Sequence, residues 1–138
     1  MLVVVFLLFT LANFTPVEGA FTGYNFGTRS AGMGGVYVAI GDDTESILIN
    51  PAGISKVDEL EFNSAYTKPY VGLPGVNLGF MLLNFAIPIK IINSCLGFAL
   101  TDFSLANTYR ENMLGLNYAY KYGWRDAFSF GVTLKYLY

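Results

Sequence analysis

The stretch FSFGVTLKYLY, residues 128–138, alternates between large apolar side chains and small or polar side chains. The large residues are Phe128, Phe130, Val132, Leu134, Tyr136 and Tyr138, and the others are Ser129, Gly131, Thr133 and Lys135, with Leu137 the one exception. Successive side chains of a β-strand point to opposite faces of its sheet, so a period of two indicates a strand. We therefore predict a strand over 128–138 with one aromatic face and one face of small and polar residues.

Four earlier stretches repeat this pattern less regularly. They are Leu60–Lys68, Val76–Leu83, Leu96–Thr101 and Leu114–Tyr122. Gly79, Gly97, Gly115 and Gly131 each come early in a stretch on its smaller-residue side, at successive spacings of 18, 18 and 16 residues. Each interval is long enough for one strand and one connection. In the second stretch, Leu78, Phe80 and Leu82 are expected on the apolar face and Gly79 on the opposite face. The sequence therefore predicts an all-β fold with about five antiparallel strands.

The composition bears on what covers the aromatic faces of these strands. Charged residues make up 13% and aromatic residues 17% of the chain, whereas an ordinary globular domain contains about 25% charged residues. A soluble sandwich with one wet face has the same period of two, but the faces opposite the aromatic ones are built here from Gly, Ala, Asn, Ser and Thr. Strands of about 9–11 residues also suit a tilted bilayer crossing. We therefore predict a transmembrane antiparallel β-barrel, of which about five strands are visible.

The lysines of the last two strands indicate which face would meet lipid. Lys121 and Lys135 both fall on the small-residue side, and a Lys on the lipid face at the bilayer midplane costs about 2–4 kcal/mol. We therefore predict that Asn117, Lys121, Thr133 and Lys135 face the lumen. The aromatic residues on either side of residues 123–126 are typical of an interfacial girdle, with simple hairpin packing as the alternative.

The connections predict a topology. If the first strand begins on the periplasmic side, residues 67–75 and 104–112 are extracellular and residues 89–94 and 123–127 periplasmic, and we expect the periplasmic pair to be the shorter one. Five strands leave two open edges, whose backbone groups hydrocarbon cannot satisfy. We therefore expect the chain to be a truncated part of a barrel, with a small barrel completed by several copies as the alternative.

The segment GTRSAGMGGVYVAIGDDTESILINPAG, residues 27–53, has a different character. Its glycines favour tight turns, and the alternation over 36–40 predicts a short strand. Asp42 with Glu45 three residues on has the spacing of a capping box, and Pro51 would end the one short helix that follows. An Asn50–Gly53 turn then reverses the chain. The residues singled out are Gly32, Met33, Gly34, Gly35, Asp42, Asp43, Asn50, Pro51, Ala52 and Gly53.

The order and spacing of Met-Gly-Gly, the acidic pair and Asn-Pro-Ala resemble those of the FadL-type and PorV/PorQ-type outer-membrane barrels. The wording of residues 29–35 is closer to the PorV/PorQ side. The resemblance implies that residues 20–58 form an N-terminal hatch or plug and that residues 59–138 form the first strands of the barrel. The alternative is a glycine-rich loop and one capped helix in a soluble β protein.

Residues 1–19 are typical of a secretory signal peptide. An apolar run over residues 2–9 precedes a polar break, and Val17 and Gly19 fit the positions before a cleavage site. No Lys or Arg precedes the run, a departure that suggests a start codon further upstream. A membrane anchor fits less well, because the run is interrupted before about 20 apolar residues. Cys95 is the only cysteine and lies far from the cleavage region, so we predict export to the bacterial outer membrane without lipoprotein anchoring.

Residues for catalysis are scarce. The chain has no His, and Cys95 has no second cysteine for a thiol pair. Asp42, Asp43 and Glu45 could bind a cation, but a helix cap explains them better. We therefore predict no enzyme, no cofactor and no metal site. A net charge of -2 and a pI near 4.9 also argue against nucleic acid as a partner.

Three functions remain, and the first two come from the resemblance. Similarity to FadL-type proteins implies passage of a hydrophobic small molecule, such as a long-chain fatty acid, past the hatch. Similarity to PorV-type proteins implies a component of type IX secretion that receives secreted proteins. The third is a plain structural barrel. We favour transport, because it needs no further machinery; the expected partners are outer-membrane lipid and either a hydrophobic small molecule or secreted proteins.

Overall fold

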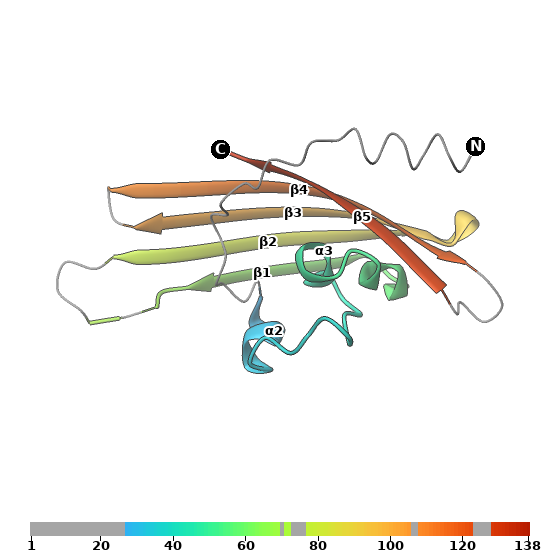
Figure 1. The fold of residues 1–138 in the computed structure, drawn as a ribbon, viewed down its shortest axis with the longest axis horizontal. Helices are drawn as coiled ribbons and strands as arrows, with labels where there is room; N and C mark the ends of the chain where they lie inside the picture. Colours follow the sequence, from blue (N-terminus) through green and yellow to red (C-terminus); the bar gives the residue numbers. More distant parts are fainter. Residues whose placement is uncertain (1–26, 70, 73–76, 106–107, 123–127) are drawn as a thin grey trace, which may run out of the picture.

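The computed structural model describes residues 27–69, 71–72, 77–105, 108–122 and 128–138, and it contains one antiparallel sheet. The strands are β1 (Glu61–Thr67), β2 (Leu78–Ile89), β3 (Ser94–Leu105), β4 (Tyr109–Tyr122) and β5 (Phe128–Leu137). Each strand pairs with its neighbours in sequence, in the order β1-β2-β3-β4-β5 (Figure 1). The predicted all-β fold with five antiparallel strands is confirmed. The predicted signal peptide lies outside the described residues.

The central strands are longer than the alternation predicted. β2 and β3 each span 12 residues and β4 spans 14. The connection between β3 and β4 is therefore reduced to residues 106–108, which is shorter than the 123–127 connection between β4 and β5. The expectation that the 104–112 connection is long was wrong, because the hydrogen-bonded ladder continues through positions without clear alternation, as far as the pair Leu105–Tyr109.

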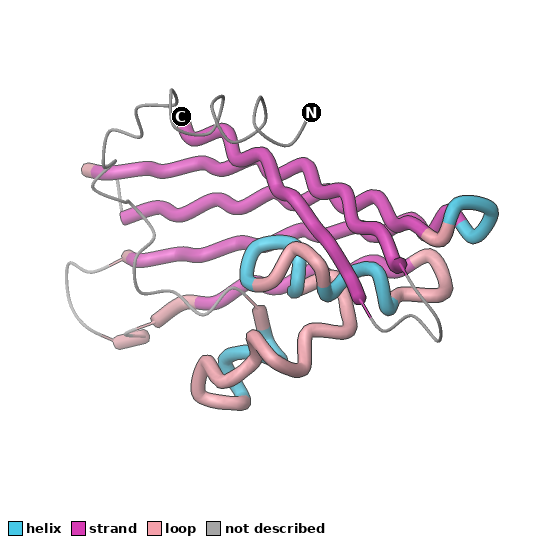
Figure 2. Tube along the Cα trace, turned by 45° about the vertical axis from the view of Figure 1, so that its right-hand side comes forward, coloured by secondary structure: helices cyan, strands magenta, loops and turns pink. Residues whose placement is uncertain are grey.

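The N-terminal segment, residues 27–58, lies against one face of the sheet (Figures 1 and 2). It contains α2 (Thr28–Gly32), α3 (Ser46–Ile49) and the 3-10 helix η1 (Gly53–Lys56), while a second 3-10 helix, η2 (Lys90–Ile92), joins β2 to β3. Contacts run from α3 to β3 and β4, and from η1 to β3, β4 and β5. Within the described ranges, no helix combines the length and apolar character needed to cross a membrane.

The short strand expected over residues 36–40 was wrong. This stretch forms consecutive turns, in which the amides of Ile40 and Gly41 both donate to the carbonyl oxygen of Tyr37 at 3.0 Å. Gly34 and Gly35 have φ values of 64° and 83°, a backbone region that side chains other than glycine rarely adopt. The chain therefore turns before the alternating residues, which pair with none of the described strands.

The two faces of the sheet differ in what covers them. The covered face packs on the N-terminal segment and includes Leu82, Asn84, Ala86, Gly97, Ala99, Thr101, Gly115, Asn117 and Ala119, all of them buried. The open face includes Phe85, Ile87, Leu96, Leu116, Tyr118, Val132 and Leu134, which are 40–71% exposed. A small core of Ile47, Leu48, Ile54 and Val57 fills the space between the segment and the covered face.

The two sides of β2 face the opposite way to the prediction from the sequence. Leu78, Phe80 and Leu82 of β2 are buried on the covered face, so Gly79 lies on the open face, where it pairs with Ser104 of β3. The reason is that both sides of this strand are apolar, so its own alternation does not distinguish them. The register with β3, in which Leu82 pairs with the buried Thr101, shows which side is covered.

Candidate functional site between the N-terminal segment and the sheet

The acidic pair of the N-terminal segment is bound to an arginine. The Arg29 guanidinium contacts Asp42 Oδ1 at 2.5 Å and Asp43 Oδ2 at 2.8 Å. It also lies over the ring of Tyr37, 5.6 Å from the ring centroid. The Tyr37 hydroxyl donates to Asp43 Oδ1 at 2.5 Å. Burial, together with this hydrogen bond, raises the pKa of Tyr37 to about 12.

The prediction that Asp42 caps the helix was wrong. α3 begins at Ser46, and Asp43, not Asp42, accepts the amide of Glu45 at 2.8 Å at its start. Asp42 instead pairs with Arg29. The helix begins only at Ser46, later than the capping-box spacing supposes, so Asp43 is the nearer of the two carboxylates to its start.

Glu45 is buried and ties three parts of the protein together. It is 1% exposed, and its carboxylate accepts the amides of Arg29 at 3.0 Å and Ser30 at 2.9 Å. It also accepts Nδ2 of Asn63 in β1 at 3.3 Å. These amides are the unpaired donors at the start of α2. Glu45 therefore closes the segment on itself and attaches it to the first strand.

The Asn50–Gly53 turn is present and is held from two sides. The amide of Gly53 donates to the carbonyl oxygen of Asn50 at 2.8 Å, and Asn50 Nδ2 donates to that of Val38 at 2.8 Å. A Cβ at Gly53 would lie 2.5 Å from the carbonyl oxygen of Gly41. The turn therefore packs directly on the backbone that precedes α3.

Glycines of the covered face make room for this turn and for α3. A Cβ at Gly131 of β5 would overlap the backbone of Pro51 and Ala52. A Cβ at Gly97 of β3 would lie 2.8 Å from Ile47 Cγ1. The regular glycine spacing seen in the sequence thus serves close approach of the N-terminal segment at Gly97 and Gly131.

Polar side chains of β4 and β5 bind the end of α3. Thr133 Oγ1 donates to the carbonyl oxygen of Ile47 at 2.9 Å and accepts Asn117 Nδ2 at 2.6 Å. Lys135 Nζ donates to the carbonyl oxygen of Leu48 at 3.2 Å. The last carbonyl groups of a helix have no partner within the helix, so these side chains satisfy acceptors that would otherwise be unpaired.

The four residues expected to face a lumen all lie on the covered face. Asn117, Thr133 and Lys135 meet at α3, whereas Lys121 lies at the far end of β4, 3.6 Å from Asp58. Of the hatch residues, Asp42, Asp43 and the 50–53 turn contribute contacts described above. Met33 is 36% exposed at the end of α2, and a Cβ at Gly32 or Gly34 would meet nothing within 4 Å.

Some polar groups of the covered face are buried without a partner. Asn84 is fully buried, and neither atom of its amide has a hydrogen-bond partner among the described residues. The Thr101 hydroxyl, 1% exposed, is in the same state. A buried polar group left unpaired costs about 1–3 kcal/mol. Groups of this kind are commonly paired by ordered water in folded proteins.

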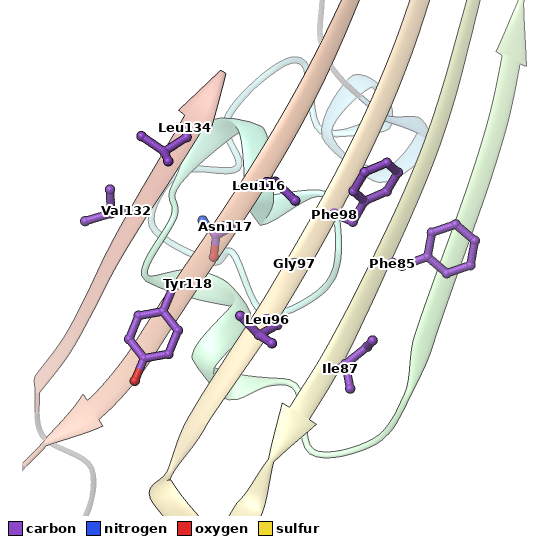
Figure 3. Close-up of a pocket in the computed structure, with 10 residues that line it drawn as sticks. All are labelled: Phe85, Ile87, Leu96, Gly97, Phe98, Leu116, Asn117, Tyr118, Val132 and Leu134. Carbon is purple, nitrogen blue, oxygen red and sulfur yellow. The ribbon is translucent and has the colours of Figure 1, made fainter. Parts of the chain in front are cut away.

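The open face carries a shallow apolar hollow of about 360 Å³ (Figure 3). Side chains from four neighbouring strands surround it, among them Ile87 of β2, Leu96 of β3, Leu116 of β4 and Leu134 of β5. In the close-up these side chains project from one side of the sheet, while Asn117 points to the other side, where the N-terminal segment lies. No Asp, Glu, Lys or Arg is among the residues that line the hollow, and its mostly aliphatic and aromatic lining suits hydrocarbon.

Sequence reasoning gave no role to Gly27 or Arg29, and it assigned Glu45 to a capping box instead of to contacts with α2. Gly27 has φ 136°, and a Cβ there would overlap the Glu45 carboxylate. Arg29 and Glu45 form the hydrogen bonds that hold the segment together. The signal available was charge: Arg29 is the only cation among residues 27–53, close in sequence to three carboxylates.

No protein-family model, no curated protein and no solved structure matches this chain. The resemblance to FadL-type and PorV/PorQ-type barrels therefore stays an expectation that rests on the residues of 27–53.

Proposed function

We propose that this chain forms part of a bacterial outer-membrane β-barrel in which the N-terminal segment is a hatch that moves to let a hydrophobic small molecule pass. The proposed ligand class is that of long-chain fatty acids. The aromatic open face meets lipid, and the covered face lines the lumen around the hatch. The remaining strands come from further chain or, alternatively, from further copies.

The observation that carries this proposal is the reversed polarity of the sheet. On β5 the aromatic and aliphatic side chains are exposed, with Phe128, Phe130 and Tyr136 each 63–66% exposed. On the same strand Thr133 and Lys135 turn inward to bind α3. A soluble protein rarely exposes a continuous apolar face of this kind. Hydrocarbon outside and polar groups inside is the arrangement that a membrane barrel needs.

The strand lengths support the same reading. A strand of 12 residues, such as β2 or β3, is about 40 Å long at about 3.3 Å per residue. At a tilt of about 40° it rises about 30 Å, the thickness of the hydrocarbon core of a bilayer.

The contacts between hatch and sheet are compatible with movement. Beyond the apolar core, the described polar contacts from α3 and η1 to the sheet come from Ser129, Thr133 and Lys135, all on β5. On the same covered face, the side chains of Asn84 and Thr101 are buried and have no partner among the described residues. Withdrawal of the hatch would hydrate these groups and offset part of the lost packing.

A reversible covalent lock tests the proposal. Ser55 Oγ of η1 and Ser129 Oγ of β5 are 2.9 Å apart, so cysteines at the two positions have side chains close enough for a disulfide bond. We expect Ser55→Cys with Ser129→Cys, in a Cys95→Ala background, to fractionate with outer membranes. Uptake of a labelled fatty acid should fall to background when the pair is oxidised and recover on reduction.

The single-cysteine variants are the matched controls and should transport equally under both conditions. Equal uptake by the locked and reduced double variant, with normal assembly, would exclude hatch movement as the transport step and leave the secretion or structural readings. Recovery of the protein in the soluble periplasmic fraction would exclude the barrel itself.

A further inference from the structure

A polar cavity of about 160 Å³ lies at the end of the sheet where η1, η2 and the last residues of β4 meet. Lys90 of η2, Lys121 of β4 and Ser94 of β3 line it, together with Asn93, Ser55 and Asp58. None of these residues lines the apolar hollow of the open face. Of them, only Ser55 also takes part in the packing of the hatch on β5, where it binds Ser129. The cavity thus differs in position and in chemistry from the hydrophobic path proposed above.

The charge lining the cavity is positive. Lys90 and Lys121 face a single carboxylate, Asp58, among the residues that line it. The ion pair between Lys121 and Asp58 is long, at 3.6 Å, and the Asp58 side chain is 83% exposed. Such an exposed pair is weak. Lys121 itself is held in place, because its amide donates to the carbonyl oxygen of Asn93 at 2.9 Å.

The two serines that line the cavity differ in the bonds of their hydroxyls. Ser94 is 5% exposed, and its Oγ has no hydrogen-bond partner among the described residues. Ser55, by contrast, already donates to the carbonyl oxygen of Ala52 at 2.7 Å and contacts Ser129. Ser94 pairs with Tyr120 and therefore shares the open face with it, whereas Lys121 lies on the covered face. The lysines, and not the serine hydroxyls, are therefore the groups that can bind a ligand in the cavity.

We propose that this cavity binds a phosphate group. Lys90 of η2 and Lys121 of β4 line it from separate elements, so that their two ammonium groups can bind different oxygens of a tetrahedral oxyanion. Lysine binds phosphate as a point charge. It does not need the planar, bidentate geometry with which arginine binds carboxylates and phosphates. A phosphate monoester carries close to two negative charges above a pKa of about 6, which matches the two lysines.

Calorimetric titration of the detergent-solubilised full chain with inorganic phosphate at pH 8 tests the site. We expect saturable binding that is at least about tenfold weaker in Lys121→Met and in Lys90→Met, from the usual strength of hydrogen bonds to charged groups. Asp58→Asn removes the competing carboxylate and should tighten binding. Lys68→Met is the matched control: it removes the same charge at an exposed position outside the cavity and should leave binding unchanged.

A second arm separates the sources of the phosphate group. A short-chain phosphatidic acid that binds more tightly than inorganic phosphate indicates a lipid headgroup, whereas equal affinity indicates the free ion. Acetate bound as tightly as phosphate would overturn the assignment of a phosphate site. Absence of saturable binding, or an equal loss in Lys68→Met and Lys121→Met with both proteins folded, would overturn it as well.

Discussion

Replacing Gly131 with alanine should loosen the hatch from β5, whereas the same change at Gly115 should not. A Cβ at Gly131 would overlap backbone atoms of Pro51 and Ala52, and no side-chain rotation relieves a clash with backbone. A Cβ at Gly115 would lie 3.4 Å from Leu48 Cδ2, which is ordinary contact. Overpacking of this kind costs about 1–3 kcal/mol.

Because both glycines lie on the covered face of paired strands, the two variants remove the same backbone freedom. Gly115→Ala should therefore be neutral or stabilise by up to about 1 kcal/mol, since glycine within a strand is unfavourable. The difference between the variants isolates the clash with the hatch.

Hydrogen exchange at the amides of Asn50, Gly53 and Ser55 gives the measurement. Each of these amides is hydrogen-bonded within the segment, to Ser46, Asn50 and Ala52 respectively. A cost of about 1–3 kcal/mol predicts exchange faster by about 5- to 150-fold in Gly131→Ala, with little change in Gly115→Ala. Equal protection of these amides in the two variants would refute the close packing of the hatch on β5.

Three further predictions concern the hatch and the two faces of the sheet. Glu45→Gln should speed exchange at the Ser30 amide by about tenfold, because one carboxylate acceptor becomes a donor facing a donor; the exposed Glu59→Gln is its control. Cysteine at Leu134 should resist a water-soluble maleimide in membranes and react after denaturation, and labelling as fast as that of cysteine at Lys68 would argue against a lipid-facing position. Since the folded pKa of Tyr37 is raised above its ordinary value of 10 to about 12, the stability it contributes is complete below pH 10 and is lost as the pH rises towards 12; exchange protection of the segment should fall in that window, and Tyr37→Phe should remove the fall.

The strands could be predicted because their signal is local. In β4 and β5 the large residues and the small or polar residues alternate along the chain itself, and the structure places them on opposite faces. The Asn50–Gly53 turn is likewise specified by its own residues, since Pro51 cannot continue a helix and disfavours helical geometry at Asn50.

The failures occur where the local signal is ambiguous. Residues 36–40 alternate as a strand does, yet they form turns and pair with none of the described strands. Asp42 has the sequence spacing of a helix cap, yet its carboxylate forms an ion pair with Arg29. β2 is apolar on both sides, so its sequence does not say which side is covered, and the expected place of Gly79 was wrong.

The sequence by itself determined the class of fold, the number of strands and the separation of an aromatic face from a small and polar one, because a period of two needs only the neighbours along the chain. Tertiary structure alone decided which side of β2 is covered and which carboxylates hold the hatch. It also decided that Thr133 and Lys135 bind the end of α3, partners that lie 86 and 87 residues away in sequence. Such contacts depend on strand register and on the path of a folded segment, neither of which is encoded in any short stretch of residues.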